Sequence, residues 1–208
     1  MPNAAFIRWS GLSLAAGGVL TILINACLTP LMLMHRPFAE TAASAMFLYR
    51  QSTSAVAVGL LLFGCIGAHL VHGDPRPRFG AVAFAMAFLG SALMLAWEWV
   101  DIFIIRDLAM RAPSALDILE KAPITSPYNL GALIPISLFT LGWIAFSIAV
   151  LRAKQLPRHA AALVIAGFFA LPLLTAAIGP KWGGALGNAI LGSGFVLLGR
   201  AIRARAAA

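Results

Sequence analysis

The sequence predicts an all-α, polytopic integral membrane protein that folds as a single domain, a bundle of six transmembrane helices. Of its 208 residues, 61% are hydrophobic and only 11% are charged, whereas a soluble domain carries about 25% charged residues. A chain of this composition has too few polar side chains to cover a surface that faces water. The composition therefore excludes a soluble enzyme, a disordered tail and a fibrous repeat.

Six apolar segments are long enough to cross a membrane. A helix that crosses a hydrocarbon core of about 30 Å needs about 20 mostly apolar residues. Barrel strands alternate polar and apolar residues over about ten positions, unlike these continuous segments. Backbone groups in lipid must pair within their own segment, so each segment is expected to be a helix. The expected helices span about residues 9–33, 53–71, 79–105, 130–151, 160–178 and 183–199.

The first segment is expected to be a retained helix. Arg8 precedes the apolar stretch, and Ile24-Asn25-Ala26-Cys27 is similar to a lipoprotein cleavage box. However, the apolar run continues to Leu33, and a signal peptide has a shorter apolar region that then stops.

The six segments leave five connections, of which the last, Gly179-Pro180-Lys181-Trp182, is a minimal turn. Two short ones end in Pro77-Arg78 and Pro157-Arg158, which predicts tight turns into the next helix. Two long ones cover residues 34–52 and 106–129. Within the second, Ser114 and Asp117 have the spacing of a capping box, which predicts a short amphipathic helix.

The basic residues predict the orientation of the bundle. If the N-terminus lies inside, nine Lys and Arg residues flank the inner ends of the segments and six flank the outer ends. This excess predicts that both termini are cytoplasmic. We expect a multi-pass protein of a bacterial cytoplasmic (inner) membrane.

Several classes of chemistry are not expected. The net charge of +8 is spread over short gaps between apolar runs, so no basic patch for nucleic acid is predicted. Cys27 and Cys65 lack the CxxC spacing of a redox or zinc site and are expected to be buried free thiols. No three-ligand metal cluster is evident, and we expect neither a metal nor a cofactor.

The acidic pair Glu98 and Asp101 is the strongest functional signal. Acidic side chains inside membrane segments usually face the bundle interior or a cavity. Residues three apart share a helix face, and Trp97 and Trp99 flank Glu98. Three interpretations stay open: a pair of acids at the outer membrane interface, functional acids in an outward-facing pocket, or a structural ion pair. The candidate cations for the ion pair are Arg36, Arg50 and Arg106.

Other polar residues fall in the outer halves of their segments and favour a polar pocket that opens outward. In this pocket Glu98 and Asp101 are the candidate catalytic residues, with Glu98 as general acid and Asp101 ionised. The candidate ligand-binding residues are Asn25, Trp97, Trp99, Thr140 and Asn188.

Three functions are compatible with this pattern. The first is a protein that binds or transforms a small lipophilic or amphiphilic ligand, and whether it is an enzyme stays open. The second is an accessory subunit whose Gly-rich sixth helix, with the GxxxG pair Gly183 and Gly187, packs against a partner protein or a second copy. The third is a small transporter or an oligomeric channel.

The C-terminal third of the chain also resembles a known class. The stretches 141–146 (LGWIAF), 151–158 (LRAKQLPR) and 187–200 are similar to a pattern in uncharacterised bacterial six-span membrane proteins of a domain-of-unknown-function class. The resemblance implies a six-span fold and carries over no activity and no functional residue.

Overall fold

The computed structural model describes residues 3–32, 36–72 and 77–206. Within these ranges all regular secondary structure is helical, which confirms the all-α class. Five helical segments are long and apolar enough to cross a membrane. Their main helices are α1 (Ala4–Leu23), α3 (Ala45–His72), α4 (Pro77–Val100), α7 (Pro127–Ala153) and α8 (Arg158–Arg205).

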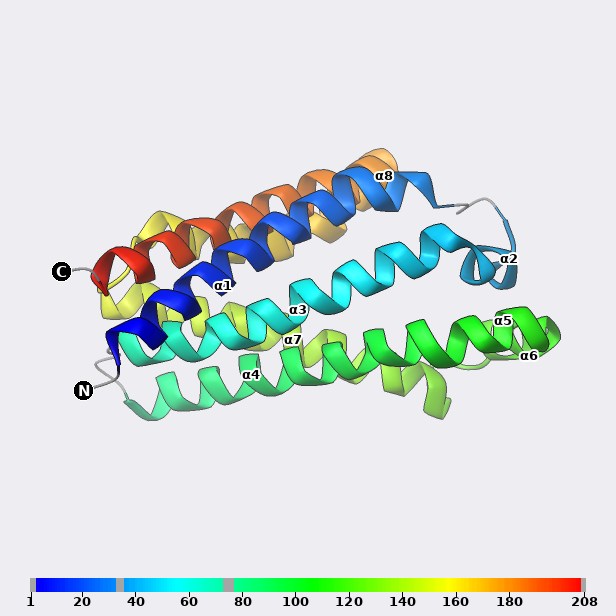
Figure 1. Ribbon diagram of the computed structural model, residues 1–208, viewed down its shortest axis with the longest axis horizontal. Helices are drawn as coiled ribbons and strands as arrows, with labels where there is room; N and C mark the ends of the chain where they lie inside the picture. The colour runs from blue at the N-terminus through cyan, green and yellow to red at the C-terminus, as the bar shows by residue number, and fades with distance from the viewer. Residues whose placement is uncertain (1–2, 33–35, 73–76, 207–208) are drawn as a thin grey trace.

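The long helices form an elongated bundle (Figure 1). α1 packs against α3 and α8, α3 against α4, α4 against α7, and α7 against α8, so the packing closes into a ring. α1 begins and α8 ends at the same end of the bundle, here called the terminal end. The opposite end, the cap end, carries the short helices α2 (Phe38–Ala43), α5 (Arg106–Arg111) and α6 (Pro113–Glu120).

α8 doubles back on itself at Gly179. This residue has φ 87°, in the left-handed region that favours glycine, and Pro180 follows it. The two halves pack antiparallel, because Gly183 lies against Leu174 and Gly187 against Leu171. The segments expected at 160–178 and 183–199 are therefore the two arms of one kinked element.

Two long helices pass through a wide π-helical turn without a break. The first turn, Ile24–Leu28, follows α1 and leads into a 3-10 turn, Thr29–Leu31. The second, Asp101–Ile105, joins α4 to α5 (Arg106–Arg111), and the N–H of Arg106 bonds the carbonyl of Asp101. Such turns are rare and recur at functional sites.

Four of the expected helix ends differ from the structure by five residues or more. α1 begins at Ala4 rather than near residue 9, and α8 ends at Arg205 rather than near 199. α3 begins at Ala45 rather than near residue 53, and the helix that starts with α4 continues to Arg111 rather than ending near 105. The reason is physical. An apolar run marks the part of a helix that contacts lipid. Backbone hydrogen bonding extends the helix past that run into the neighbouring polar residues.

The cap end is closed by a small hydrophobic cluster. Here Leu116 of α6 (Pro113–Glu120) and alanines of α2 (Phe38–Ala43) and α5 pack with Phe47 of α3 and Ile105 of the π turn. The short amphipathic helix expected in this loop is thus present. Its predicted cap is wrong, since α6 begins with Pro113 as its first residue and has no side-chain cap.

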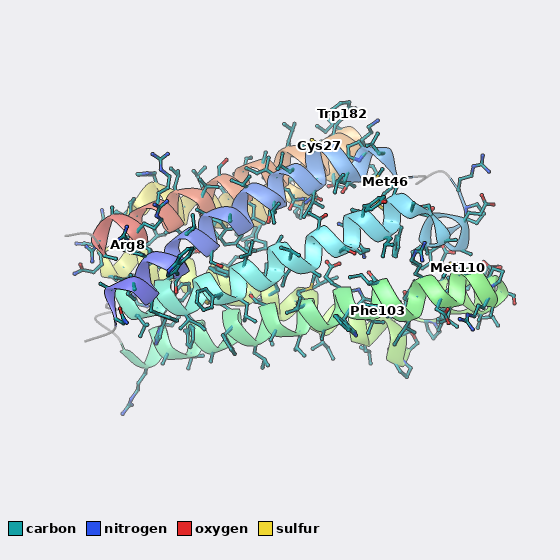
Figure 2. All side chains as sticks on the ribbon, in the orientation of Figure 1. Arg8, Cys27, Met46, Phe103, Met110 and Trp182 are labelled. Atoms are coloured by element: carbon teal, nitrogen blue, oxygen red, sulfur yellow. The ribbon has the colours of Figure 1, made fainter. Side chains whose placement is uncertain are left out.

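The main core lies toward the terminal end and contains Trp143, Phe146 and Phe195. The indole Nε1 of Trp143 donates to Ser91 Oγ on α4 at 3.1 Å. Cys65 is buried in this core, as expected, but Cys27 is exposed on the outside of the bundle (Figure 2). Both thiols are free.

Candidate functional site

Glu98 of α4 and Asp101, the first residue of the π turn that follows it, lie side by side on the face that packs against α3. The side chain of Glu98 is 4% exposed and that of Asp101 is 8% exposed. Their spacing of three residues places them on one face, and here that face is the bundle interior. The carboxyl groups thus face the neighbouring helices rather than the outside of the bundle.

Two side chains of α3 bind these carboxyl groups. Ser54 Oγ donates to Glu98 Oε1 at 2.6 Å, and Gln51 Nε2 donates to Asp101 Oδ2. Gln51 and Ser54 are themselves three residues apart. Since α3 and α4 run antiparallel, this spacing matches that of the acids and pairs each donor with one carboxyl group.

Arg50 lies beside the pair without contacting it directly. Its Nη1 donates to Gln51 Oε1, so the amide stands between the guanidinium group and Asp101. Arg50 still interacts electrostatically with both carboxyl groups. Among the described residues the salt bridges are Arg36–Glu40 and Arg111–Asp107, so neither acid of the pair has a direct ion-pair partner there.

Two buried atoms of this cluster lack a hydrogen-bond partner among the described residues. One is Glu98 Oε2 and the other is Arg50 Nε. A buried polar atom left without a partner costs about 1–3 kcal/mol, and more if it is charged. Folded proteins rarely keep such atoms, so these two mark a place where the protein alone does not complete the hydrogen bonding.

The two tryptophans next to Glu98 lie in different places. Trp97 is half-buried and packs against Tyr128 of α7, with ring centroids 5.5 Å apart. Trp99 is 61% exposed and packs on Phe103, which lies on the outer face (Figure 2). Trp99 is therefore not brought to the carboxyl groups, because consecutive helix residues are rotated by about 100°.

The remaining candidate residues, Asn25, Thr140 and Asn188, do not contact the acidic pair. Asn25 and Asn188 each donate to the carbonyl four residues earlier in their own helix, those of Thr21 and Gly184, at 2.9 Å. Local bonds of this kind are the usual outcome for polar side chains in membrane helices. Thr140 also lies apart from the pair, since its neighbour Phe139 packs at Gly90, eight residues and about 12 Å along α4 from Glu98.

Sequence reasoning named Arg50 as a candidate ion-pair partner of the acids and counted Gln51 and Ser54 among the outer polar residues, but it did not include these three among the candidate site residues. A usable signal was present, because the spacing of Gln51 and Ser54 repeats that of Glu98 and Asp101. In the described ranges no group of three His, Cys, Asp or Glu residues comes close enough to hold a metal ion.

No known protein family, curated protein or solved structure matches the chain. The resemblance of the C-terminal third to six-span proteins therefore stays a prediction.

Proposed function

We propose that the chain is a six-span membrane protein that binds a small amphiphilic molecule through Glu98, Asp101 and Arg50. The observation that carries the proposal is the buried Glu98 carboxyl group, which is held by Ser54 on one oxygen and finds no partner for the other among the residues that the structure describes. A bound polar head would supply that partner.

The polar head that fits this site both donates and accepts hydrogen bonds. Glu98 Oε2 is available as an acceptor and Arg50 Nε as a donor. The hydroxyl-rich or amine-containing head of an amphiphile offers both groups, while its apolar part can remain among the surrounding apolar helices. If the ligand is also transformed, Glu98 is the group that would exchange a proton with it.

Replacement of Glu98 by Gln tests this function. Purified protein is incubated with the lipid extract of the expressing cells and washed, and the retained molecules are identified by native mass spectrometry. We expect the wild type to retain one small amphiphile and E98Q to retain at least about 10-fold less, because a charge-assisted hydrogen bond is lost.

The matched control is E120Q, the same change at an exposed position of α6. It is expected to retain the ligand like the wild type. Equal retention by E98Q, with an unchanged melting temperature, would contradict the proposal. Retention of a protein partner in place of a small molecule would favour the accessory-subunit alternative.

The six-span arrangement is supported by the kink at Gly179. The two arms of α8, residues 158–178 and 180–205, are each about as long as a membrane span requires. The proposed orientation places the terminal end in the cytoplasm of a bacterial cell, in line with the excess of Lys and Arg at that end. The turn between the two arms then faces outward.

Cysteine labelling tests this topology. In a C27S/C65A background, K181C is expected to react with a membrane-impermeant maleimide in intact cells. R205C is expected to react only after the membrane is opened. Reaction of both from the same side would rule out the sixth span, and reaction of R205C alone from outside would reverse the orientation.

A further inference from the structure

A basic cavity lies at the terminal end, far from Glu98 along the bundle. It has a volume of about 300 Å³ and is lined by Ala5, Arg8, Trp9 and Leu12 of α1 and by Arg203 of α8. A second hollow of about 280 Å³ shares Arg8 and Arg203 and adds Arg200. Figure 2 shows Arg8 at this end, beside the final turns of α8.

Close packing of two glycines brings these arginines together. A Cβ on Gly11 would lie 2.7 Å from the carbonyl oxygen of Gly199 and 2.9 Å from Cγ of Arg203. Only glycine lets the two backbones approach this closely. The guanidinium groups are thus held near one another by the packing of α1 on α8.

The positive charge of this cavity has no counterpart on the helices that form it. Neither α1 nor α8 contains an Asp or Glu. The salt bridges of the described residues lie elsewhere, in α5 and next to α2. A cluster of arginines with no acid binds phosphate well, because each guanidinium group can donate two parallel hydrogen bonds to it.

An apolar groove continues from the basic cavity along the outside of the bundle. It has a volume of about 380 Å³ and is lined by Trp9, Leu12, Ser13 and Ala16 of α1 and by Leu60 and Phe63 of α3. Trp9 and Leu12 line both the groove and the cavity. From Trp9 to Ala16 the helix rises about 11 Å, so the groove leads away from the arginines into the apolar part of the bundle.

We propose that these joined surfaces bind one anionic phospholipid, with its phosphate on Arg8, Arg200 and Arg203 and an acyl chain in the groove. Basic pockets between membrane helices recognise such head groups. A zwitterionic lipid would bring its own cation next to three arginines, and the two helices that carry them have no acid to receive it. A free phosphate would use the arginines and leave the groove unused.

Binding is tested with phosphatidylglycerol and phosphatidylcholine, titrated separately into detergent-purified protein and read by native mass spectrometry. We expect one phosphatidylglycerol to bind at least 10-fold more tightly than phosphatidylcholine. R8Q/R203Q is expected to lose this preference. The control R78Q/R158Q removes the same charge from the same end of the bundle but outside the cavity, and it is expected to keep the preference.

The groove is tested with A16F, which fills it with a ring and leaves the arginines unchanged. A16F is expected to weaken phosphatidylglycerol binding at least about 5-fold, while inorganic phosphate competes poorly with the lipid. Full binding by A16F together with effective competition by phosphate would reduce the site to a simple anion site and overturn the lipid proposal. An equal loss of the preference for phosphatidylglycerol in R8Q/R203Q and R78Q/R158Q would overturn it as well. The melting temperature of each variant shows whether a loss of binding comes from misfolding. Phosphatidylglycerol binding to E98Q, measured in parallel, separates this lipid from the ligand at Glu98.

Discussion

G187L is expected to destabilise the protein by about 3 kcal/mol or more, enough to leave little folded protein in detergent. Gly187 lies where the two arms of α8 touch. A Cβ there would lie 2.5 Å from Cα of Leu171, a backbone atom that cannot move aside as a side chain can. The larger side chain must therefore push the arms of the hairpin apart.

The control for this variant is G184L, one turn earlier in the same arm. A Cβ on Gly184 meets no atom within 4 Å, so the added side chain points into open space. Melting temperature and the monodisperse fraction on size exclusion are measured for both variants. Equal behaviour of the two would mean that the hairpin is not packed as described here.

W143A is expected to cost about 3 kcal/mol through the cavity that it leaves. Trp143 is fully buried and contacts Phe195 of α8 and Phe146 of its own helix, with ring centroids 4.7 and 5.9 Å away. Apolar side chains gain little by leaving lipid, so the loss is mainly one of van der Waals contacts. The measurement is the melting temperature of W143A, which is expected to be lower than that of the wild type.

Two further variants separate the contributions of Trp143. W143F keeps most of the ring volume and removes the hydrogen bond to Ser91, so we expect a loss of about 1 kcal/mol. This loss is small because Ser91 Oγ still donates to the carbonyl oxygen of Ala87. W99A changes an exposed tryptophan and is expected to leave the melting temperature nearly unchanged. A loss in W99A equal to that in W143A would show that the core is not centred on Trp143.

The glycines also bear on the idea of a partner helix. Gly183 and Gly187 pack against the first arm of α8, and Gly192 and Gly199 pack against α1. The GxxxG pair that suggested a partner is therefore occupied within the chain. Spacing alone shows that a close helix contact forms, but it does not tell which helix provides the other side.

The membrane class and the approximate positions of the helices follow from the long apolar runs. Their ends do not, since the helix begun by α4 runs past Asp101 into Arg106 and Asp107, residues that an apolar pattern treats as loop. The hairpin at Gly179 was expected as two separate helices. The sequence predicts the minimal turn at residues 179–182 between them, and the structure adds that the two arms pack against each other.

For the site, the sequence predicts that Glu98 and Asp101 share a face, because this depends only on helix periodicity. The partners Gln51 and Ser54 depend on the register between α3 and α4, which is set by packing over their whole length. Asn25 and Asn188 are predicted from their residue type and their depth in the outer halves of their segments, without knowledge of which helix face they occupy. Their local bonds to Thr21 and Gly184 show why type alone is a weak guide in membrane helices.

The wide turn at Asp101–Ile105 also bears on which changes in chain length the molecule tolerates. A π turn holds one residue more than the α-helical path between the same two ends requires. Loss of one residue inside this turn restores a plain α-helix and leaves both flanking helices on their present faces. Loss of one residue earlier in α4 instead rotates everything after it by about 100°, which turns Asp101 away from Gln51 and the cap away from α2. This turn is therefore the natural place for insertions and deletions to accumulate in this helix as related chains diverge.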